Sequence, residues 1–554
     1  MFEKVHPRLK DLFLVMISSI CITFSFAPFE IWPLGFLALL PVFYLIDSKN
    51  IEKKIFKESI ILGLSFAVVL DTMAYYWIIH TITVFGHLSY PFAFLIFLLY
   101  AAGTSVRFIL FFIMVFYWNR WKDKTSGDKI LLKNPYVSLT GFWVISEFLG
   151  WQLFPWYGGN IVSGNHWFIQ TADIWGIRGV SIAWFIISFG IYRIIILCQR
   201  KYRQKEKIKI IGIIFSDKSL LFSIILFFFA HIYGIFADWR WTKKENTYEA
   251  KNIAVIQGNT PLAFENTRNI RAELNRIIRE MVNQTLSLAN EAKNKDINID
   301  LLVWPESAVP FLQYKRDKYL QSEIQRLQNE LPVEFIFSDI DSRKTKERGV
   351  ETFSNVWLLS EDGDPIESYQ KIYLLPFGEY MPLGDVFPFL KDEFREVSNF
   401  NRGYRHTLLP SKIGNLLPLV CYEVVPPEFT LDFYRNTKKK ANIIINLTND
   451  KWFGETIESY QHMELGRIRA IELRIPIIRS TNSGISAYID TVGNINDPTD
   501  IFTRENRLYN VKIPQNNATL FSFWGNIPVY LFIFFFCALW VLQGLRVYNY
   551  RNTR

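Results

Sequence analysis

The sequence predicts a protein of two parts, a bundle of about eight membrane-spanning α-helices and a layered α/β domain. Of its 554 residues, 50% are hydrophobic, which is too many for an ordinary soluble enzyme, while 20% are charged, which is too many for a pure membrane bundle. Apolar stretches of spanning length recur through the first half of the chain. A long mixed region at 251–515 follows them and precedes one last apolar stretch.

The membrane part is predicted from stretches that approach the roughly 20 apolar residues that a span needs. They lie at 11–28, 32–47, 57–80, 91–118, 136–151, 178–198, 218–237 and 520–546, of which the second and fifth are short. We therefore expect a membrane domain of seven helices at 1–240 and an eighth helix with a basic tail at 516–554. Charged residues interrupt some spans, and we interpret them as helix–helix contacts or interface residues, with a functional role as the alternative: Asp71, Arg107, Glu147 and Arg193.

The distribution of Lys and Arg predicts how these spans are oriented. Basic residues gather at the N-terminus, at 49–57, 120–133 and 200–209, and at the C-terminus, whereas the alternate loops are almost free of them. With eight spans, every basic segment falls on one side, which the positive-inside rule makes cytoplasmic. We therefore expect a multi-pass membrane protein with 251–515 on the outer side, which in a bacterium with two membranes is the periplasmic side of the cytoplasmic (inner) membrane. The net charge of +9 arises from these loops, and no nucleic-acid-binding motif accompanies it.

The 251–515 region alternates strand-like and helix-like segments, as in α/β layered domains. Strands are predicted at 251–258, 300–304, 334–338, 356–363, 416–421, 441–446, 477–480 and 485–490, and helices at 265–294, 314–329 and 459–474.

Polar residues cluster where these strands end, which is where α/β sheets usually carry their sites. Glu306 follows one strand, Cys421 ends another, and Asn449-Asp450 follow a third. The other cysteines, Cys21, Cys198 and Cys537, lie in or beside apolar stretches, so Cys421 has no disulfide partner in its domain. Cys421 is therefore a candidate nucleophile, and a buried structural cysteine is the alternative.

Six segments of this region resemble apolipoprotein N-acyltransferases, a family within the nitrilase (carbon–nitrogen hydrolase) superfamily. They are Trp304-Pro-Glu306-Ser-Ala, Tyr369-Gln-Lys371-Ile-Tyr-Leu-Leu-Pro-Phe-Gly-Glu379-Tyr380, Cys421-Tyr-Glu423, Asn446-Leu-Thr-Asn-Asp-Lys-Trp452-Phe-Gly454, Gln461-His-Met-Glu-Leu-Gly-Arg-Ile-Arg-Ala-Ile-Glu472 and Arg479-Ser-Thr-Asn482-Ser-Gly484. The resemblance covers the whole domain in order, and Phe26-Ala-Pro-Phe-Glu-Ile-Trp-Pro33 extends it to the N-terminal part.

The resemblance implies a nitrilase-like α-β-β-α sandwich with a catalytic triad of Glu306, Lys371 and Cys421. Glu306 would take and return the thiol proton, while Lys371 would stabilise the thiolate and the oxyanion. Glu379 and Glu423 are implied as supporting residues, and a purely structural role is equally open for both. No cofactor and no metal are implied.

The implied reaction is a two-step, ping-pong acyl transfer. An acyl chain passes from a membrane phospholipid to Cys421 as a thioester, and then to the α-amino group of the diacylglyceryl-cysteine that begins a lipoprotein. The expected partners are therefore the phospholipid donor, the lipoprotein acceptor and the membrane, with the enzyme a monomer. A membrane-tethered amidase or nitrile hydrolase is one alternative, because water can resolve the same thioester, and a transporter or scaffold with an inactive domain is another.

Aromatic residues near the triad motifs are candidates for a substrate pocket. We expect Tyr380, Tyr422, Trp452 and Phe264 to contribute, with packing as the alternative role for each. The sequence departs from the family pattern at 257–265, where Leu262 replaces a glutamine and no tryptophan follows closely. This departure leaves a relative of altered activity as a further alternative, although it does not affect the triad.

Overall fold

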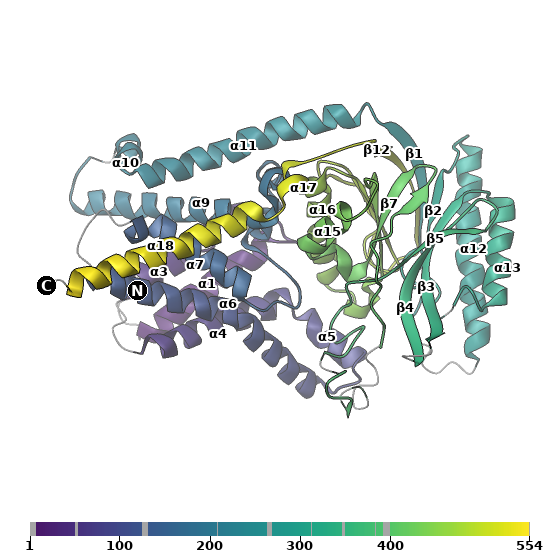
Figure 1. Ribbon diagram of the computed structural model, residues 1–554, viewed down its shortest axis with the longest axis horizontal. Coiled ribbons are helices and arrows are strands. Elements are labelled where there is room, and N and C mark those ends of the chain that lie inside the picture. The colour runs from purple at the N-terminus through teal and green to yellow at the C-terminus, as the bar shows by residue number, and fades with distance from the viewer. Residues whose placement is uncertain are drawn as a thin grey trace. The chain divides into compact units, whose positions relative to one another are not determined.

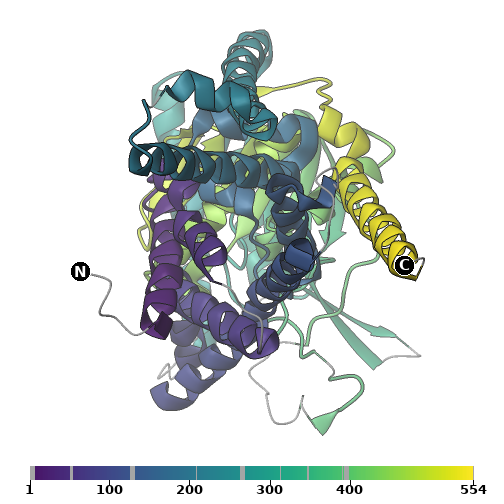
Figure 2. The same ribbon diagram turned by 90° about the vertical axis from the view of Figure 1, so that its left-hand side faces the viewer.

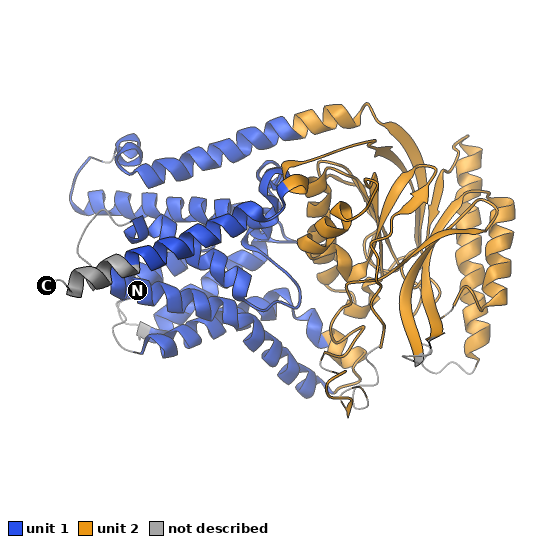
Figure 3. Ribbon diagram, in the orientation of Figure 1, with its two compact units in different colours: residues 1–79, 89–237, 524–554 blue, residues 80–88, 238–523 orange. Residues whose placement is uncertain are grey.

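The computed structural model describes residues 7–49, 54–124, 131–207, 209–262, 269–311, 313–345, 349–382, 384–389, 391 and 399–552. Contacts within the chain divide it into two compact units (Figure 3). Unit 1 comprises residues 1–79, 89–237 and 524–554, and unit 2 comprises residues 80–88 and 238–523. Unit 2 therefore includes a short segment, 80–88, that lies between two predicted membrane spans in the sequence.

Unit 1 is helical (Figure 1), and its helices α1, α4 and α6 pack side by side, as do α6 and α7 (Figure 2). Its helices are α1 (Pro7–Ser25), α2 (Trp32–Leu37), α3 (Leu40–Ser48), α4 (Ile55–Ala74), α6 (Tyr90–Lys124), η2 (Leu131–Lys133), α7 (Pro135–Leu149), η3 (Gly158–Val162), α8 (His166–Ile169), α9 (Ala172–Arg203), α10 (Ile210–Ser216) and α18 (Ile527–Asn552). Two further helices, α5 (Trp77–Val84) and α11 (Lys218–Glu245), begin in unit 1 and end in unit 2.

Three helices among the described residues are long and apolar enough to cross a membrane, namely Tyr90–Lys122, Ala172–Arg203 and Lys218–Glu245. A fourth span results if α4 and α5, which meet at a bend of 69°, are counted together. A helix overlaps each of the eight predicted stretches, but some are short, as α7 is with 15 residues, or carry charges near one end, as α1 does. The number eight therefore stays a prediction.

The contact between α4 and α6 depends on a glycine. A Cβ atom on Gly63 would lie 2.6 Å from the main-chain nitrogen of Ile109, so only glycine allows the two backbones to approach this closely. Next to this contact, the rings of Phe66 and Phe108 stack with centroids 4.2 Å apart. The hydroxyl of Thr104 on α6 donates to Asp71 on α4 at 2.5 Å, which agrees with a helix-pairing role for this buried carboxylate.

Unit 2 contains two six-stranded sheets, ordered β12-β1-β2-β3-β4-β5 and β11-β10-β9-β8-β7-β6. Strands β1, β2 and β3 are mutually parallel in the first sheet, and β7, β8 and β9 are parallel in the second. The strands are β1 (Glu249–Gln257), β2 (Leu301–Val303), β3 (Glu334–Thr345), β4 (Gly349–Leu359), β5 (Pro365–Gln370), β6 (Leu409–Ser411), β7 (Gly414–Val420), β8 (Ile443–Thr448), β9 (Ile477–Thr481), β10 (Ala487–Ile489), β11 (Ile495–Asn496) and β12 (Glu505–Ile513).

Helices cover both sheets and complete an α-β-β-α sandwich, with α12 and α13 on the first sheet and α15 and α16 on the second (Figure 1). These helices are α12 (Ile270–Asn294), α13 (Lys318–Glu330), α15 (Pro427–Arg435) and α16 (Glu458–Leu473), with shorter turns at η4 (Cys421–Val424), η5 (Asp450–Phe453) and α17 (Leu520–Trp524). The nitrilase-like sandwich predicted for this region is confirmed.

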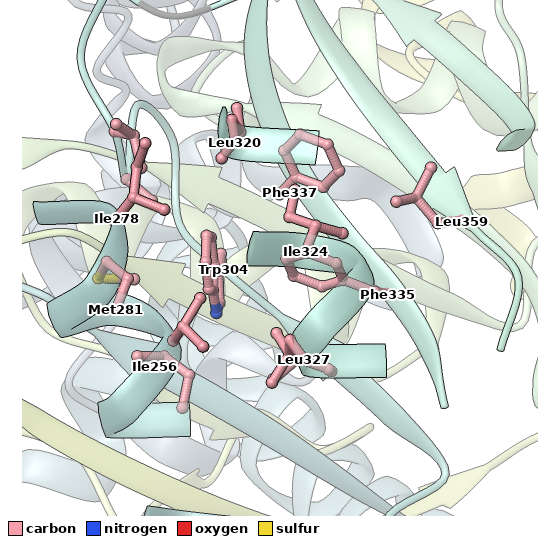
Figure 4. Packing of buried hydrophobic residues seen from close by; sticks show 14 of the residues in the cluster. Ile256, Ile278, Met281, Trp304, Leu320, Ile324, Leu327, Phe335, Phe337 and Leu359 are labelled. Atoms are coloured by element: carbon pink, nitrogen blue, oxygen red, sulfur yellow. The ribbon is translucent and has the colours of Figure 1, made fainter. Parts of the chain in front are cut away.

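A hydrophobic core joins α12 and α13 to the first sheet (Figure 4). Ile278 and Met281 of α12 and Ile324 of α13 pack against Trp304 and Phe335, and all five side chains are buried. The apolar positions of α12 recur every three or four residues, which places them on one face of the helix. This core supports β2, whose carboxyl end leads directly to Glu306.

Candidate active site

The three predicted triad residues all follow strands of the sandwich. Glu306 lies just beyond β2 and Lys371 directly follows β5, both in the first sheet, whereas Cys421 directly follows β7 in the second. Cys421 opens the short turn η4 with φ +50°, a left-handed conformation that is strained for a residue with a Cβ atom. Such strain persists only where surrounding contacts hold the residue, and it is found most often at active sites.

The structure brings these three side chains together. Nζ of Lys371 lies 3.7 Å from Oε1 of Glu306, and the Cys421 thiol interacts electrostatically with both of these charged groups. All three residues are buried, Lys371 completely so. The arrangement places a base next to a thiol and a cation next to both, which is the requirement for nucleophilic catalysis by cysteine.

Glu379 holds the lysine from a second side. Its Oε1 lies 2.6 Å from Nζ of Lys371, while its Oε2 accepts a hydrogen bond of 2.8 Å from the main-chain N–H of Leu375. The Glu379 carboxylate therefore orients the Lys371 ammonium group and also holds the loop between Lys371 and Glu379 in place.

Burial and charge give each triad residue a distinct protonation state. Burial and the Glu306 carboxylate raise the pKa of the Cys421 thiol, against the opposing effect of Lys371, so the resting thiol keeps its proton. Burial likewise raises the pKa of Glu306, and Lys371 limits that rise. Burial alone would lower the pKa of Lys371. The carboxylates of Glu379 and Glu306 outweigh this effect and raise the pKa, so the ammonium form is stable. Attack by the thiol therefore requires a base, and Glu306 is in position to act as one.

Glu423 connects the lysine loop to the cysteine loop through a buried carboxylate. Its Oε1 accepts hydrogen bonds from the Tyr369 hydroxyl and from the N–H groups of Ile372 and Tyr373, at 2.8 to 3.0 Å. Its Oε2 accepts from the N–H of Val420 at 2.9 Å. Burial raises the pKa of Glu423 to about 7, although Lys371 and these donors oppose the rise. The contacts make Glu423 a residue that sets the relative position of the two catalytic loops.

The predicted pocket residues differ in their surroundings. Tyr422, next to the nucleophile, is buried and its ring lies 5.6 Å from that of Tyr373, which is 40% exposed. Tyr380 is half-buried under the guanidinium of Arg402, with 5.1 Å between Cζ and the ring centroid. These residues place an aromatic surface beside the triad.

Trp452 packs against the 80–88 segment, with its ring 4.5 Å from that of Phe85, and its carbonyl accepts a hydrogen bond from Thr81. It is 40% exposed, so it is not a core residue. Phe264, the fourth predicted pocket residue, lies outside the described residues.

Three further buried residues lie behind the nucleophile. The sequence pattern places Asp450 at one of the strand ends where the site is expected but assigns it no role, and His462 and Arg479 occur there only within the family motifs. His462 on α16 contacts the carbonyl oxygen of Cys421 through Nε2 at 3.3 Å and Oδ1 of Asp450 through Nδ1 at 3.0 Å. Arg479 on β9 donates to Oδ2 of Asp450 at 2.9 Å. Asp450 follows β8, the neighbour of β7, and Arg479 lies within β9, the next strand of the sheet, so their place in the sheet order was the available signal.

Asp450, Glu458 and His462 form a group whose ligand atoms lie within 4.8 Å of one another, among the residues that the structure describes. The donor set is poorly suited to a metal ion, because the guanidinium of Arg479 already neutralises Asp450 and both ring nitrogens of His462 face other groups. We therefore assign these residues to a hydrogen-bond network.

Comparisons with known proteins match both units. Residues 18–190 match the family model described as apolipoprotein N-acyltransferase N-terminal domain, and residues 252–526 match that of carbon-nitrogen hydrolases. Apolipoprotein N-acyltransferase 2 of Leptospira interrogans is 30% identical, with 92% of each chain covered. Apolipoprotein N-acyltransferase of Bdellovibrio bacteriovorus is 27% identical, with 95% of this chain and 92% of that chain covered.

Among solved structures, Saccharomyces cerevisiae Nit3, a member of branch 10 of the nitrilase superfamily, matches 50% of this chain and 95% of its own. The two share 16% sequence identity with a TM-score of 0.36. The family models and the full-length relatives agree with the sandwich fold and with the resemblance seen in the sequence. The chain belongs to the apolipoprotein N-acyltransferase family.

Proposed function

We propose that this chain transfers an acyl chain from a membrane phospholipid to the α-amino group of the diacylglyceryl-cysteine that begins a lipoprotein. The observation that carries the proposal is the contact of Lys371 with Glu306 and Glu379 beside the buried thiol of Cys421, which interacts electrostatically with all three residues. Membership in the family supports the choice of donor and acceptor.

In the first half-reaction, Sγ of Cys421 attacks the ester carbonyl of the phospholipid while Glu306 takes the thiol proton. Lys371, together with the N–H of Tyr422, stabilises the oxyanion of the tetrahedral intermediate. The ester C–O bond then breaks, Glu306 returns the proton to the departing glycerol oxygen, and a lysophospholipid leaves the thioester behind.

In the second half-reaction, the lipoprotein amine attacks the thioester carbonyl. Glu306 takes a proton from the amine, the C–S bond breaks, and the proton returns to the sulfur, so the products are an amide and the free thiol. Both substrates are anchored in a bilayer, so the aromatic surface formed by Tyr422, Tyr373 and Tyr380 is well suited to receive their apolar parts.

The same proposal includes the topology. Eight spans and the distribution of basic loops support a periplasmic position for the catalytic region at 251–515, between a seven-helix domain at 1–240 and the last helix at 516–554. The apolar helices of unit 1 support attachment to the membrane.

Labelled acyl transfer tests the proposal directly. Purified protein is incubated in detergent with a phospholipid that carries a labelled acyl chain, and its peptides are analysed by mass spectrometry. We expect label on the Cys421 peptide, release of the lysophospholipid, and loss of the label when a diacylglyceryl-cysteine peptide is added.

Cys421→Ala is the inactive control, and Cys198→Ala, which removes a cysteine of unit 1, is the matched active control. Acyl transfer by Cys421→Ala would disprove the mechanism. Release of ammonia from small amides without any lipid would instead identify a hydrolase.

A further inference from the structure

The main chain of Cys421 has a second support that does not belong to the triad. His462 of α16 reaches the carbonyl oxygen of Cys421 with Nε2, 3.3 Å away. A carbonyl oxygen can only accept, so this contact is a hydrogen bond when Nε2 carries a proton. Nδ1 can donate to Asp450 at the same time only in the imidazolium form, which Asp450 favours and burial and Arg479 oppose. The histidine is 96% buried, so water does not compete for the carbonyl.

A rigid chain of contacts fixes the His462 ring. Nδ1 faces Oδ1 of Asp450 at 3.0 Å, and Oδ2 of Asp450 accepts from Nη2 of Arg479 at 2.9 Å. The same guanidinium donates to Oδ1 of Asn446 at 2.6 Å. Asp450 and Arg479 are fully buried, and their ion pair is therefore held in one geometry.

The contacts also link three neighbouring strands of the second sheet. Cys421 directly follows β7, Asp450 follows β8, and Arg479 lies within β9. Because His462 comes from the helix that covers this sheet, it connects the helix to the carboxyl ends of all three strands. The Cys421 carbonyl is thus tied to a buried network that joins β7, β8, β9 and α16.

Cys421 needs such a support because its backbone is strained at φ +50°. Glu423 accepts from the N–H of Val420, the residue before Cys421, and Glu306 interacts electrostatically with the Cys421 thiol. Neither of these contacts involves the carbonyl group of Cys421, which is contacted by His462.

We propose that His462, oriented by Asp450 and Arg479, is a positioning residue that holds Cys421 in its left-handed conformation through the Cys421 carbonyl. This inference rests on the proposed function, because it assigns a support to the same nucleophile. His462 acts through the main chain and carries no proton for the reaction.

The experiment uses three substitutions that separate the two ring nitrogens. Glutamine at 462 presents an amide donor where Nε2 lies, asparagine presents one where Nδ1 lies, and methionine has the length of glutamine without a donor. The full-length protein is purified in detergent, and the rate of Cys421 acylation by a labelled phospholipid is measured in single turnovers alongside thermal unfolding.

We expect His462→Gln to acylate within about threefold of the unsubstituted protein, and His462→Asn and His462→Met to be slower by about 10- to 100-fold, the usual effect of a misplaced reacting group. The loss should appear in the rate at saturating phospholipid and leave the half-saturating concentration unchanged. The comparison of glutamine with methionine decides the matter even if His462→Asn does not fold.

Equal rates for His462→Gln and His462→Met would overturn the inference, as would slow acylation by His462→Gln with normal acylation by His462→Asn. The first result would mean that the histidine has only a structural role, and the second that its Nδ1 contact with Asp450, and not its contact with the Cys421 carbonyl, supports acylation. Failure of the proposed function is distinguishable, because the unsubstituted protein itself would then show no label on Cys421.

Discussion

The ammonium group of Lys371 lies 2.6 Å from Oε1 of Glu379, and the lysine is completely buried. A buried cation is costly unless it is paired, so Glu379 stabilises the charge that the reaction uses. Since Lys371 also lies 3.7 Å from Glu306, its position determines the field at the thiol and at the developing oxyanion. The fine geometry of the site thus depends on a carboxylate that need not touch the substrate.

Glu379→Gln should test this dependence. The amide keeps the size of the side chain but removes the charge, so Lys371 is less firmly held, and we expect acylation to slow by about 10- to 100-fold. The melting temperature should fall only modestly. Glu330→Gln, on the exposed end of α13, is the matched control, and unchanged acylation in Glu379→Gln would contradict the role assigned to this carboxylate.

The acylation half-reaction should depend on pH through Glu306. The raised pKa of Glu306 lies above the ordinary glutamate range. Below this pKa the carboxyl group is protonated, so it cannot act as the base. The acylation rate should therefore rise with pH through that raised value and then level off. The raised pKa of Lys371 predicts no alkaline loss below about pH 10, near the ordinary lysine value.

Rapid-quench measurement of labelled Cys421 between pH 5 and 10, with phospholipid as the sole substrate, avoids titration of the acceptor amine. Glu306→Gln serves as the control, since it should be slow at every pH. A rate that stays nearly constant down to pH 5, as expected for a glutamate with the ordinary pKa of about 4.3, would argue against the buried base.

Replacement of Glu423 should produce graded effects. Alanine removes the acceptor for four donors, and we expect it to destabilise unit 2 by about 3–5 kcal/mol, as breaking a buried network does. Glutamine keeps one oxygen and misplaces one donor, so its cost should be about 1–3 kcal/mol. Thermal unfolding in detergent measures both, and equal melting temperatures for the two variants would contradict this assignment.

Sequence reasoning was most successful where one residue type carries the chemistry. Cys421 was identifiable because it is the only cysteine of its domain and because an apolar strand ends there. Glu306 and Lys371 came from the resemblance, and the structure places both beside it. Glu423 was named as a supporting residue. Its hydrogen bonds to Ile372 and Tyr373 could not be predicted, because these residues lie 50 or more positions away in the chain.

Other parts of the fold lacked a local signal. Strand β12 pairs with β1 across more than 240 residues, and it escaped prediction because Arg507 and Asn510 interrupt its apolar positions. The links from His462 to Asp450 and Cys421 are equally non-local, so the motif that contains His462 did not by itself indicate a role for this residue. The contact of Trp452 also lacked a local signal, because its partner Phe85 lies in a segment between two predicted spans.

The predicted topology can be tested by cysteine labelling. In a variant without native cysteines, Lys293→Cys on α12 and Gln204→Cys at the end of α9 introduce exposed thiols in the two units. If 251–515 is periplasmic, a membrane-impermeant maleimide should label the first in cells whose outer membrane alone is permeabilised. The second should react only after the inner membrane is disrupted, and the reverse pattern would refute the orientation.

Gly454 ends the η5 turn with φ +69° and ψ −178°, a backbone conformation that essentially only glycine adopts. A Cβ atom there would also meet Nε2 of His80 in the 80–88 segment. Gly454→Ala should therefore destabilise unit 2 for two separable reasons, with a backbone cost of about 1–3 kcal/mol.

A second substitution separates these two costs. His80→Ala removes the side chain that the new methyl group would meet, so the double variant should recover the steric part of the loss but not the backbone part. Thermal unfolding of the four proteins forms a double-mutant cycle, in which we expect a coupling of about 0.5–3 kcal/mol, the range found for residues in contact. Additive effects would show that the 80–88 segment does not pack on the Trp452 turn, because the methyl group would then meet no histidine.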